Sequence, residues 1–272
     1  MNFKLSAFAD EAGKNIGEQI EALRENGIEY LEIRGVDGQN ISAITNEKAK
    51  EVKRQLDDAG IAVWSLGSPY GKINIDGDFD GHLDSFKHGL ELADILGTQR
   101  IRMFSFYVPA GSEAIYRDDV LEKLERMIDT AKGSGIILCH ENEKGIYGAT
   151  ASGCAEIHKA FPTLRAVFDP ANFIQCKQDT VKAWDMLSDY VDYMHIKDAL
   201  ENGSVVPAGK GIGNLPYLLE RYRGEVLTLE PHLSVFSGFE QLEANEKTKM
   251  GYCYPTHRAA FDAAVNALKE LI

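Results

Sequence analysis

Several features of specialised protein classes are missing from this sequence. Its four cysteines are Cys139, Cys154, Cys176 and Cys253; none form a Cys-x-x-Cys motif, and a disulfide framework would be denser. No apolar run approaches the roughly 20 residues that cross a membrane. The first residues also lack the apolar segment of a signal peptide. We therefore expect a reduced, cytoplasmic protein without a membrane partner.

Positive charge is also scarce. The 272 residues include 29 Lys and Arg against 42 Asp and Glu, for a formal net charge of −13. Proteins that bind nucleic acids need a basic surface, so no nucleic-acid partner is expected. The chain has no low-complexity stretch and no linker rich in Pro, Gly or Ser. Its length then predicts a single domain over residues 1–272.

What the sequence does contain is a regular alternation of short apolar segments and amphipathic segments. The predicted strands are Lys4–Ala9, Tyr30–Arg34, Ala62–Leu66, Arg100–Phe106, Ile136–Glu141, Arg165–Asp169, Tyr190–His195 and Glu225–Glu230. The predicted helices are Ile16–Asn26, Asn46–Ala59, Gly81–Leu96, Asp119–Ala131, Gly153–Ala160, Val181–Leu187, Pro216–Arg221 and Arg258–Leu271. Successive strands end about 32 residues apart, close to the ~30 residues of a βαβ unit.

Eight such units in about 250 residues predict a (β/α)8 TIM barrel. The rival fold is a doubly wound sheet, in which the first strand usually leads into a glycine-rich phosphate-binding turn. The first strand here leads into Ala9-Asp10-Glu11-Ala12-Gly13, which is no such turn. The barrel is therefore the predicted fold.

The fifth to eighth predicted strands each end in a residue that can bind a metal: Glu141, Asp169, His195 and Glu230. The carboxyl ends of barrel strands meet at one rim, where three carboxylates would repel one another unless a cation neutralised them. An oxygen-rich set with one nitrogen suits Mn²⁺, Mg²⁺ or Co²⁺, with Zn²⁺ as an alternative. We predict one divalent ion there. The competing interpretation is four separate caps or ion pairs.

Four short motifs occur in order at these strand ends: Glu141-Asn142, Asp169-x-x-Asn172, His195-x-Lys197-Asp198 and Glu230-Pro231. Together they resemble the sugar phosphate isomerase/epimerase group of the xylose isomerase-like TIM barrel superfamily, which includes the ketose 3-epimerases. The resemblance implies that the four residues hold one divalent cation, and that Glu141 and Glu230 also act as the acid/base pair. Two departures leave the substrate open. Asn172 stands where ketose epimerases have His, and the stretch after His195 has no Arg.

These residue types suit proton removal from a carbon next to a carbonyl, because a metal can stabilise the enediolate that forms and carboxylates can carry the proton. We predict a divalent-metal-dependent isomerase or epimerase of a sugar or sugar phosphate, with a keto-sugar or inosose dehydratase (a lyase) as the alternative. An endonuclease IV-like nuclease is disfavoured by the negative charge and by Arg34 and Leu66–Gly67, where further His ligands would stand. A non-catalytic sugar-binding barrel is disfavoured by the intact Glu141 and Glu230 pair.

Substrate contacts are predicted from strand alternation, since residues two apart share a face. The predicted set is Lys197, Asn172, Glu143, His232, Arg34 and Trp64. For three of these residues, a structural role is an alternative to substrate contact. Lys197 could instead pair with Glu143 or Asp198, Arg34 could pair with Glu32, and Trp64 could be core packing.

Two loops complete the predictions. The glycine-rich stretch Pro207–Pro216 follows the seventh strand, in the region where barrels often bind phosphate. The long segment Ser234–Tyr254 carries several aromatic residues. It is a candidate lid or dimer contact, and a homo-oligomer therefore stays open.

Overall fold

Eight parallel strands form a closed barrel in the computed structural model, which describes residues 3–234 and 252–272. In ring order they are β1 (Lys4–Ala7), β12 (Val226–Leu229), β9 (Val191–Ile196), β8 (Arg165–Phe168), β7 (Ile137–Glu141), β6 (Arg100–Met103), β5 (Ala62–Gly67) and β2 (Tyr30–Ile33). The ring closes where β1 pairs with β12, with Ala7 opposite Leu229. The predicted (β/α)8 barrel is confirmed.

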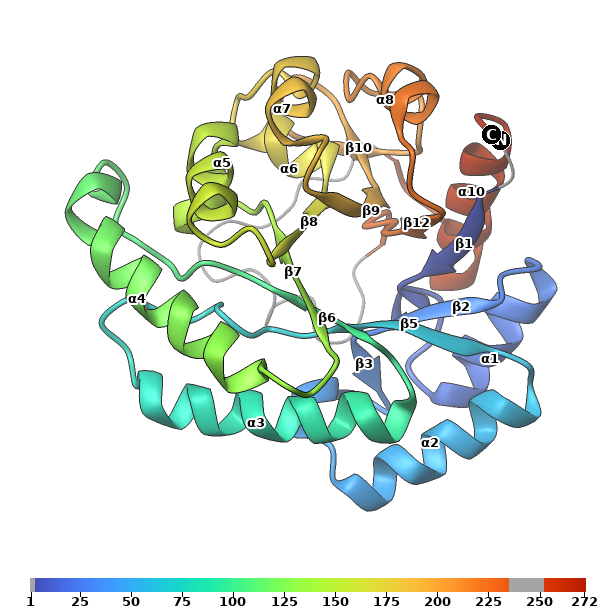
Figure 1. Cartoon of the computed structure of the whole chain (residues 1–272). Helices are drawn as coiled ribbons and strands as arrows, with labels where there is room; N and C mark the ends of the chain where they lie inside the picture. The colour runs from blue at the N-terminus through green and yellow to red at the C-terminus, as the bar shows by residue number, and fades with distance from the viewer. Residues whose placement is uncertain (1–2, 235–251) are drawn as a thin grey trace.

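Helices surround the barrel (Figure 1). They are α1 (Ile16–Glu25), α2 (Asn46–Asp58), α3 (Phe79–Leu96), α4 (Glu113–Ala131), α5 (Ala151–Ala160), α7 (Thr180–Leu187), α8 (Leu215–Arg221) and α10 (His257–Lys269). Each buries one apolar stripe, as in α2, where Ala49, Val52 and Leu56 face the strands. Helices α3 and α4 begin earlier than predicted. The Asp78 side chain accepts the N–H of Gly81 and starts α3 before the first regularly spaced apolar residue.

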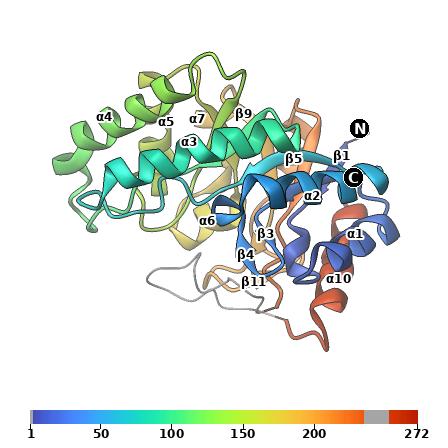
Figure 2. The ribbon, with the colours of Figure 1, turned by 90° about the horizontal axis from the view of Figure 1, so that it is seen from below.

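The last helix closes the structure against the first elements. Helix α10 lies beside α1 and β1 (Figures 1 and 2). Asn26 donates to Asp262 Oδ1 at 2.7 Å, and Lys269 donates to the Asn26 carbonyl at 2.7 Å. These contacts join segments more than 230 residues apart in the sequence.

Small elements follow the carboxyl ends of several strands. They are the 3-10 helices η1 (Ala9–Glu11), η2 (Ile41–Ala43) and η3 (Tyr147–Ala149), the hairpins β3–β4 (Gly35–Val36 and Gln39–Asn40) and β10–β11 (Asp198–Ala199 and Val205–Val206), and helix α6 (Pro170–Gln175). Figure 2 shows β3, β4, β11 and α6 on one side of the barrel. This side carries the carboxyl ends of the strands, where the predicted site lies.

The structure bears on two predictions about partners, the membrane and a second copy of the chain. Among the described residues, no helix is both long enough and apolar enough to pass through a membrane. Residues 235–251 of the predicted lid or dimer contact lie outside the described residues. The homo-oligomer stays a prediction.

Candidate metal centre

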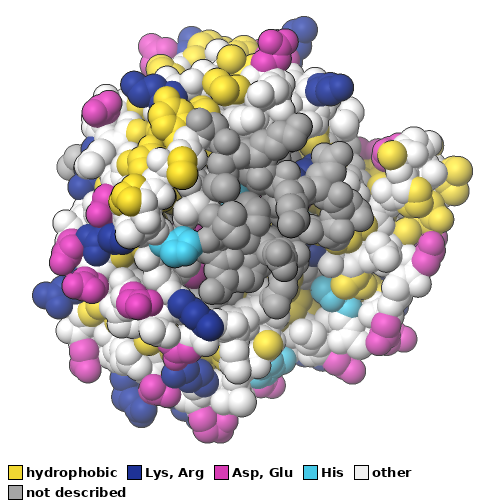
Figure 3. All heavy atoms as spheres, turned by 180° about the vertical axis from the view of Figure 1, so that it is seen from behind, with side chains coloured by type: hydrophobic (Ala, Val, Ile, Leu, Met, Phe, Trp, Pro, Cys, Tyr) yellow, Lys and Arg dark blue, Asp and Glu magenta, His cyan; other side chains and the backbone are white. Residues whose placement is uncertain are grey.

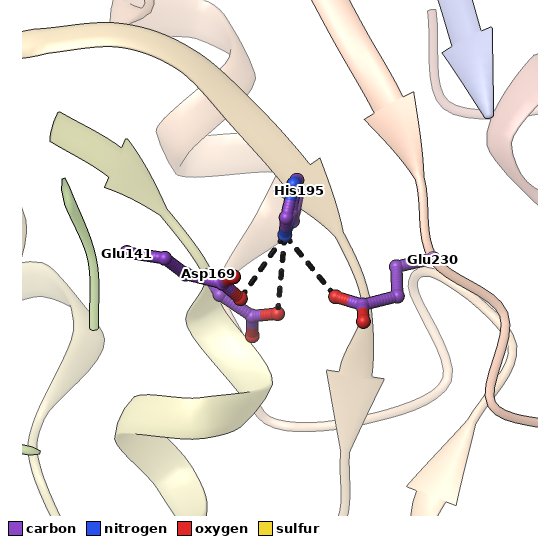
Figure 4. A group of neighbouring side chains, drawn as sticks. All are labelled: Glu141, Asp169, His195 and Glu230. Atoms are coloured by element: carbon purple, nitrogen blue, oxygen red, sulfur yellow. Dashed lines mark hydrogen bonds and ion pairs between the residues drawn. The ribbon is translucent and has the colours of Figure 1, made fainter. Parts of the chain in front are cut away.

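Three carboxylates and one imidazole converge at the carboxyl ends of β7, β8, β9 and β12. One ligand atom from each of Glu141, Asp169, His195 and Glu230 lies within 4.8 Å of the other three, and all four residues are buried. In Figure 4 the carboxylates point toward Nδ1 of His195. That atom lies 3.1 Å from Glu141 Oε1, 3.1 Å from Glu230 Oε2 and 4.0 Å from Asp169 Oδ2. The four residues chosen from strand ends are therefore neighbours in space.

Asp169 has a structural role as well as a place in this group. It follows β8 directly and caps α6, because its Oδ1 accepts the N–H of Asn172 at 2.8 Å. The side chain of Asn142 holds the Asp169 backbone from the other side, donating to its carbonyl and accepting its N–H, both at 2.9 Å. Oδ2 is left facing the group. Asp169 can therefore act both as a helix cap and as a metal ligand: Oδ1 caps α6, and Oδ2 is available to the metal group.

His195 is oriented by a carboxylate behind it. Its Nε2 lies 3.1 Å from Glu32 Oε2, and Tyr193 donates to Glu32 Oε1 at 2.9 Å. A histidine that binds a metal through one nitrogen commonly gives the other N–H to a carboxylate, which sets its tautomer. Glu32 is placed for that role, with Nδ1 turned into the group.

Each of the two glutamates is also held by an arginine. Arg102 Nη1 donates to Glu141 Oε2 at 3.0 Å, and Asn172 Nδ2 lies 3.2 Å from Glu141 Oε1. Arg34 Nη1 lies 3.3 Å from Glu230 Oε1. These charge-assisted contacts fix the direction of both carboxylates.

The connected network carries an excess of negative charge. It contains six carboxylates and three permanent cations: Asp10, Glu11, Glu32, Glu141, Asp169 and Glu230, with Arg34, Arg102 and Lys197. With every carboxylate ionised and the histidines neutral, the excess would be three negative charges, of which a divalent ion would offset two. Burial raises the pKa of Glu11 to about 8, which is one response to this excess. Buried charge of one sign is costly unless it is compensated.

The pKa values of the group respond to the same imbalance. Burial raises the pKa of Asp169 to about 7, against the pull of Lys197 and with the help of Glu230. Burial would lower the pKa of His195, but the charges of Glu141 and Glu32 outweigh it and raise that pKa well above its ordinary value. Burial also works against ionisation of Glu141, yet His195 and Arg102 lower its pKa to about 2. Protons on Asp169 and His195 would thus compensate charge that a divalent ion could compensate instead.

The residues present fit a divalent ion. Three oxygens and one nitrogen are the donors that Mn²⁺, Co²⁺ and Zn²⁺ accept. Asp169 Oδ2 is buried and accepts no hydrogen bond among the described residues, although Lys197 Nζ lies 2.8 Å away as an ion pair. A second group, Glu11, Glu230 and His232, also brings ligand atoms within 4.8 Å of one another. There the guanidinium of Arg34 already lies 3.1 Å from Glu11 and 3.3 Å from Glu230, so a second cation has no place.

Four of the predicted substrate residues contact the group, Arg34 among them, and Lys197 has other partners than the two expected. Lys197 pairs with Asp169 at 2.8 Å and with Glu230 at 3.1 Å, rather than with Glu143 or Asp198. Asn172 contacts Glu141, and His232 Nε2 lies 3.2 Å from Glu230 Oε1. Their contact with a substrate stays a prediction.

Arg34 also has partners outside the group, and the two remaining predicted residues, Glu143 and Trp64, have other surroundings. Arg34 binds Asp10, Glu11 and Glu230 instead of Glu32. Glu143 pairs with Lys72 at 3.0 Å. Trp64 packs edge-on against Tyr193 in a cluster with Cys139, Val167 and Val226, with Arg100 over its ring. These contacts favour core packing for Trp64, because the cluster lies toward the amino ends of the strands, away from the metal group.

The glycine-rich loop is not arranged as a phosphate site. Asp198 turns away from the metal group, and its carboxylate accepts the N–H groups of Gly209, Gly211 and Gly213 at 2.9–3.0 Å. Lys210 is exposed. The amides that could have bound a phosphate are therefore used by the chain's own carboxylate.

Three residues of the site were not predicted: Glu11, Arg102 as a partner of Glu141, and Glu32 as a partner of His195. Glu32 and Arg102 occupy inward-facing strand positions, where a charged residue is itself a signal because barrel interiors are mostly apolar. Glu11 sits in η1 and gave no such signal.

Comparisons with known proteins show the family and the fold of the chain. The family model described as "Xylose isomerase-like TIM barrel" matches residues 20–230, which is most of the chain. The chain belongs to that family. A search of curated protein sequences finds no match.

Solved structures share the fold at low sequence identity. A probable 3-DHS dehydratase involved in petrobactin synthesis from Bacillus anthracis is 15% identical with a TM-score of 0.72, and 99% of each chain is covered. The IolI protein, solved with a zinc atom, is 16% identical with a TM-score of 0.73, covering 98% of this chain and 97% of that one. D-Psicose 3-epimerase from Clostridium cellulolyticum, solved with D-tagatose, is 14% identical with a TM-score of 0.71, covering 98% and 97%. At these identities the likeness shows the barrel fold alone.

The surface agrees with the expected absence of a nucleic-acid partner, which stays a prediction. On the face opposite to the view of Figure 1, Lys and Arg side chains are interspersed with Asp and Glu around the periphery (Figure 3). The net charge of −13 gives no basic excess overall.

Proposed function

We propose that this family member is a divalent-metal-dependent enzyme that isomerises or epimerises a sugar or sugar phosphate. The reaction moves a proton at the carbon next to a carbonyl. One observation carries the proposal: Glu141 and Glu230 approach His195 Nδ1 from two sides, each at 3.1 Å, with Asp169 facing the same atom. Two carboxylates on opposite sides of one centre can take a proton from one face of a substrate and return it to the other.

Glu141, Asp169, His195 and Glu230 would hold the ion. When bound, a divalent cation supplies a Lewis acid that stabilises negative charge on enediolate oxygens. Arg102 and Arg34 direct the two glutamates, at 3.0 Å and 3.3 Å. The Lys197 ammonium lies between Asp169 and Glu230 and can bind a substrate oxygen. Burial of all these groups excludes water from the proton path.

A dehydratase acting on a keto-sugar or inosose is the second candidate, because a further buried group stands beside one base. His232 Nε2 lies 3.2 Å from Glu230 Oε1. Glu230 could take a proton from the carbon and, as a carboxylic acid, return that proton to the leaving hydroxyl on the neighbouring carbon. His232, whose pKa burial holds well below its ordinary value, would serve as a neutral hydrogen-bond partner. The similarity to a probable dehydratase supports this candidate as much as the similarity to an epimerase supports the first.

The experiment begins with metal analysis of the purified protein before and after loading with Mn²⁺. His195→Ala is the control for specific loading. The loaded protein is then incubated in heavy water with ketoses, aldoses, inososes and their phosphates. A product of unchanged formula with one carbon-bound deuterium supports isomerisation or epimerisation, and a product lacking one water supports the dehydratase. Failure of the wild-type protein to retain any ion would overturn both.

A further inference from the structure

Glu11 is a buried carboxylate outside the predicted ligand set, and it binds two residues that hold Glu230. Its Oε1 lies 3.1 Å from Arg34 Nη2, and its Oε2 accepts the backbone N–H of His232 at 2.6 Å. Arg34 and His232 in turn lie 3.3 Å and 3.2 Å from Oε1 of Glu230. Glu11 is only 1% exposed. It therefore joins β1, through η1, to the groups that follow β2 and β12.

The backbone of His232 shows what this contact achieves. His232 has a φ of 45°, in the left-handed region that residues other than glycine seldom adopt. Such a conformation persists only where the surroundings hold it. The hydrogen bond from the His232 N–H to Glu11 does so, and the imidazole is thereby directed to Glu230.

The two carboxylate oxygens of Glu230 consequently contact different groups. Oε1 contacts Arg34 and His232, while Oε2 lies 3.1 Å from His195 Nδ1 and 3.1 Å from Lys197 Nζ. Arg34 also binds Asp10, with both contacts at 2.9 Å. Of the two acids that bind Arg34 beside Glu230, Asp10 and Glu11, it is Glu11 that also accepts the N–H of His232.

We propose that Glu11 is a positioning residue: it clamps Arg34 and His232 on one oxygen of Glu230 so that the other oxygen faces the metal centre. The effect on metal affinity rests on the proposed function, whereas the effect on the Glu230 side chain does not. Groups behind a metal ligand commonly change affinity about 10–100-fold when they are altered.

The decisive variant is Glu11→Gln, which keeps the shape but has only one acceptor oxygen. Its amide NH2 must face either the His232 N–H or the Arg34 guanidinium, so one clamp opens. We expect the metal-free crystal structure to show Glu230 turned from Arg34 or His232. We also expect Mn²⁺ affinity, measured by calorimetric titration, to fall about 10–100-fold. The control Asp192→Asn removes a carboxylate from Arg100 at the amino ends of the strands, and should leave the Glu230 position and the Mn²⁺ affinity unchanged.

The outcomes separate this proposal from the proposed function. Glu230 in its original place in Glu11→Gln would overturn the positioning role, whatever the metal result. A wild-type protein that binds no Mn²⁺ would overturn the metal centre, while the Glu230 position would still decide the role of Glu11. If Glu11→Gln does not fold, Glu11→Asp replaces it, since the shorter side chain keeps the charge beside Arg34 but withdraws from His232. The same displacement of Glu230 is expected there.

Discussion

The ammonium of Lys197 lies 2.8 Å from Oδ2 of Asp169, the same oxygen that faces His195 across the candidate metal centre. Lys197 also lies 3.1 Å from Glu230. Lys197 and a divalent ion would thus draw on the same carboxylate oxygens. A protonated lysine cannot ligate a metal, so its role must differ from that of the imidazole two residues before it.

We expect His195→Ala to lower Mn²⁺ affinity strongly and Lys197→Ala to keep the metal while reducing turnover. The alanine at 195 removes the only nitrogen donor of the four, whereas the alanine at 197 removes a positive charge that competes for Asp169. Calorimetric titration and metal content measure the first effect, and deuterium exchange with an identified substrate measures the second. Equal loss of metal in both variants would contradict this division.

Glu32→Gln should weaken Mn²⁺ binding about 10–100-fold, because the carboxylate behind His195 sets its tautomer and basicity. Glu32 Oε2 lies 3.1 Å from His195 Nε2. Glu29→Gln is the matched control, since Glu29 is exposed just before the same strand. Calorimetric titration of both variants with Mn²⁺ measures the difference, and equal Mn²⁺ affinities would exclude an orienting role for Glu32.

Glu141→Gln and Glu230→Gln should each cost about 10²–10⁴-fold in rate, the usual contribution of one proton-transfer group. Gln keeps the shape and an oxygen donor but cannot accept the proton. In heavy water, one variant should still exchange the substrate proton without completing inversion, because the base of the first half-reaction remains. Full turnover in both variants would move the proton-transfer role to Lys197 or Glu143.

Metal affinity should rise with pH. The pKa of Asp169 is raised to about 7, chiefly by burial, and the pKa of His195 is raised by Glu141 and Glu32 against the effect of burial. Both groups keep protons to higher pH in the folded protein than in the unfolded chain. Their contribution to the stability of the metal-free protein is therefore full at low pH and is lost as the pH rises through the folded pKa values.

A divalent ion must displace those protons, so binding should release protons and strengthen between about pH 6 and pH 8. The increase in melting temperature with saturating Mn²⁺ should also be larger at the higher pH. Titrations in buffers of different ionisation enthalpy measure the proton release directly. An affinity independent of pH would show that neither group carries a proton that the metal displaces.

Gly211→Ala should destabilise the protein by about 1–3 kcal/mol, the typical cost of forcing an extra methyl into packed surroundings. A Cβ at Gly211 would lie 2.3 Å from the Ala199 carbonyl oxygen and from Asp198 Oδ1. Gly17→Ala is the contrasting change, because a Cβ there meets nothing within 4 Å and Gly17 is the second residue of α1. That variant should gain about 0.4–1 kcal/mol, because alanine restricts the unfolded chain. Urea unfolding measures both, and equal effects would contradict the tight packing of the loop around Asp198.

The sequence alone was enough to predict the barrel and to select Glu141, Asp169, His195 and Glu230 as one group. The reason is that the parallel strands of a barrel bring their carboxyl ends to one rim. A residue that directly follows an apolar strand segment is therefore expected at that rim. Local signals were weaker for short elements. Helix α6 (Pro170–Gln175) was not predicted because nearly all of its residues are buried, so no polar face gives it a periodic pattern.

Only the tertiary structure showed which side chains contact and orient the four predicted metal ligands. Glu11, Glu32 and Arg102 come from β1, β2 and β6 or the turns after them, and Glu11 meets His232 across 221 residues of chain. No spacing rule links residues so distant, because their contact depends on closure of the ring between β1 and β12. Likewise, Asp198 follows Lys197 directly but binds the glycine-rich loop, while Lys197 binds Asp169. The pleat sends neighbouring side chains to opposite faces, and what each face meets is set by the closed barrel.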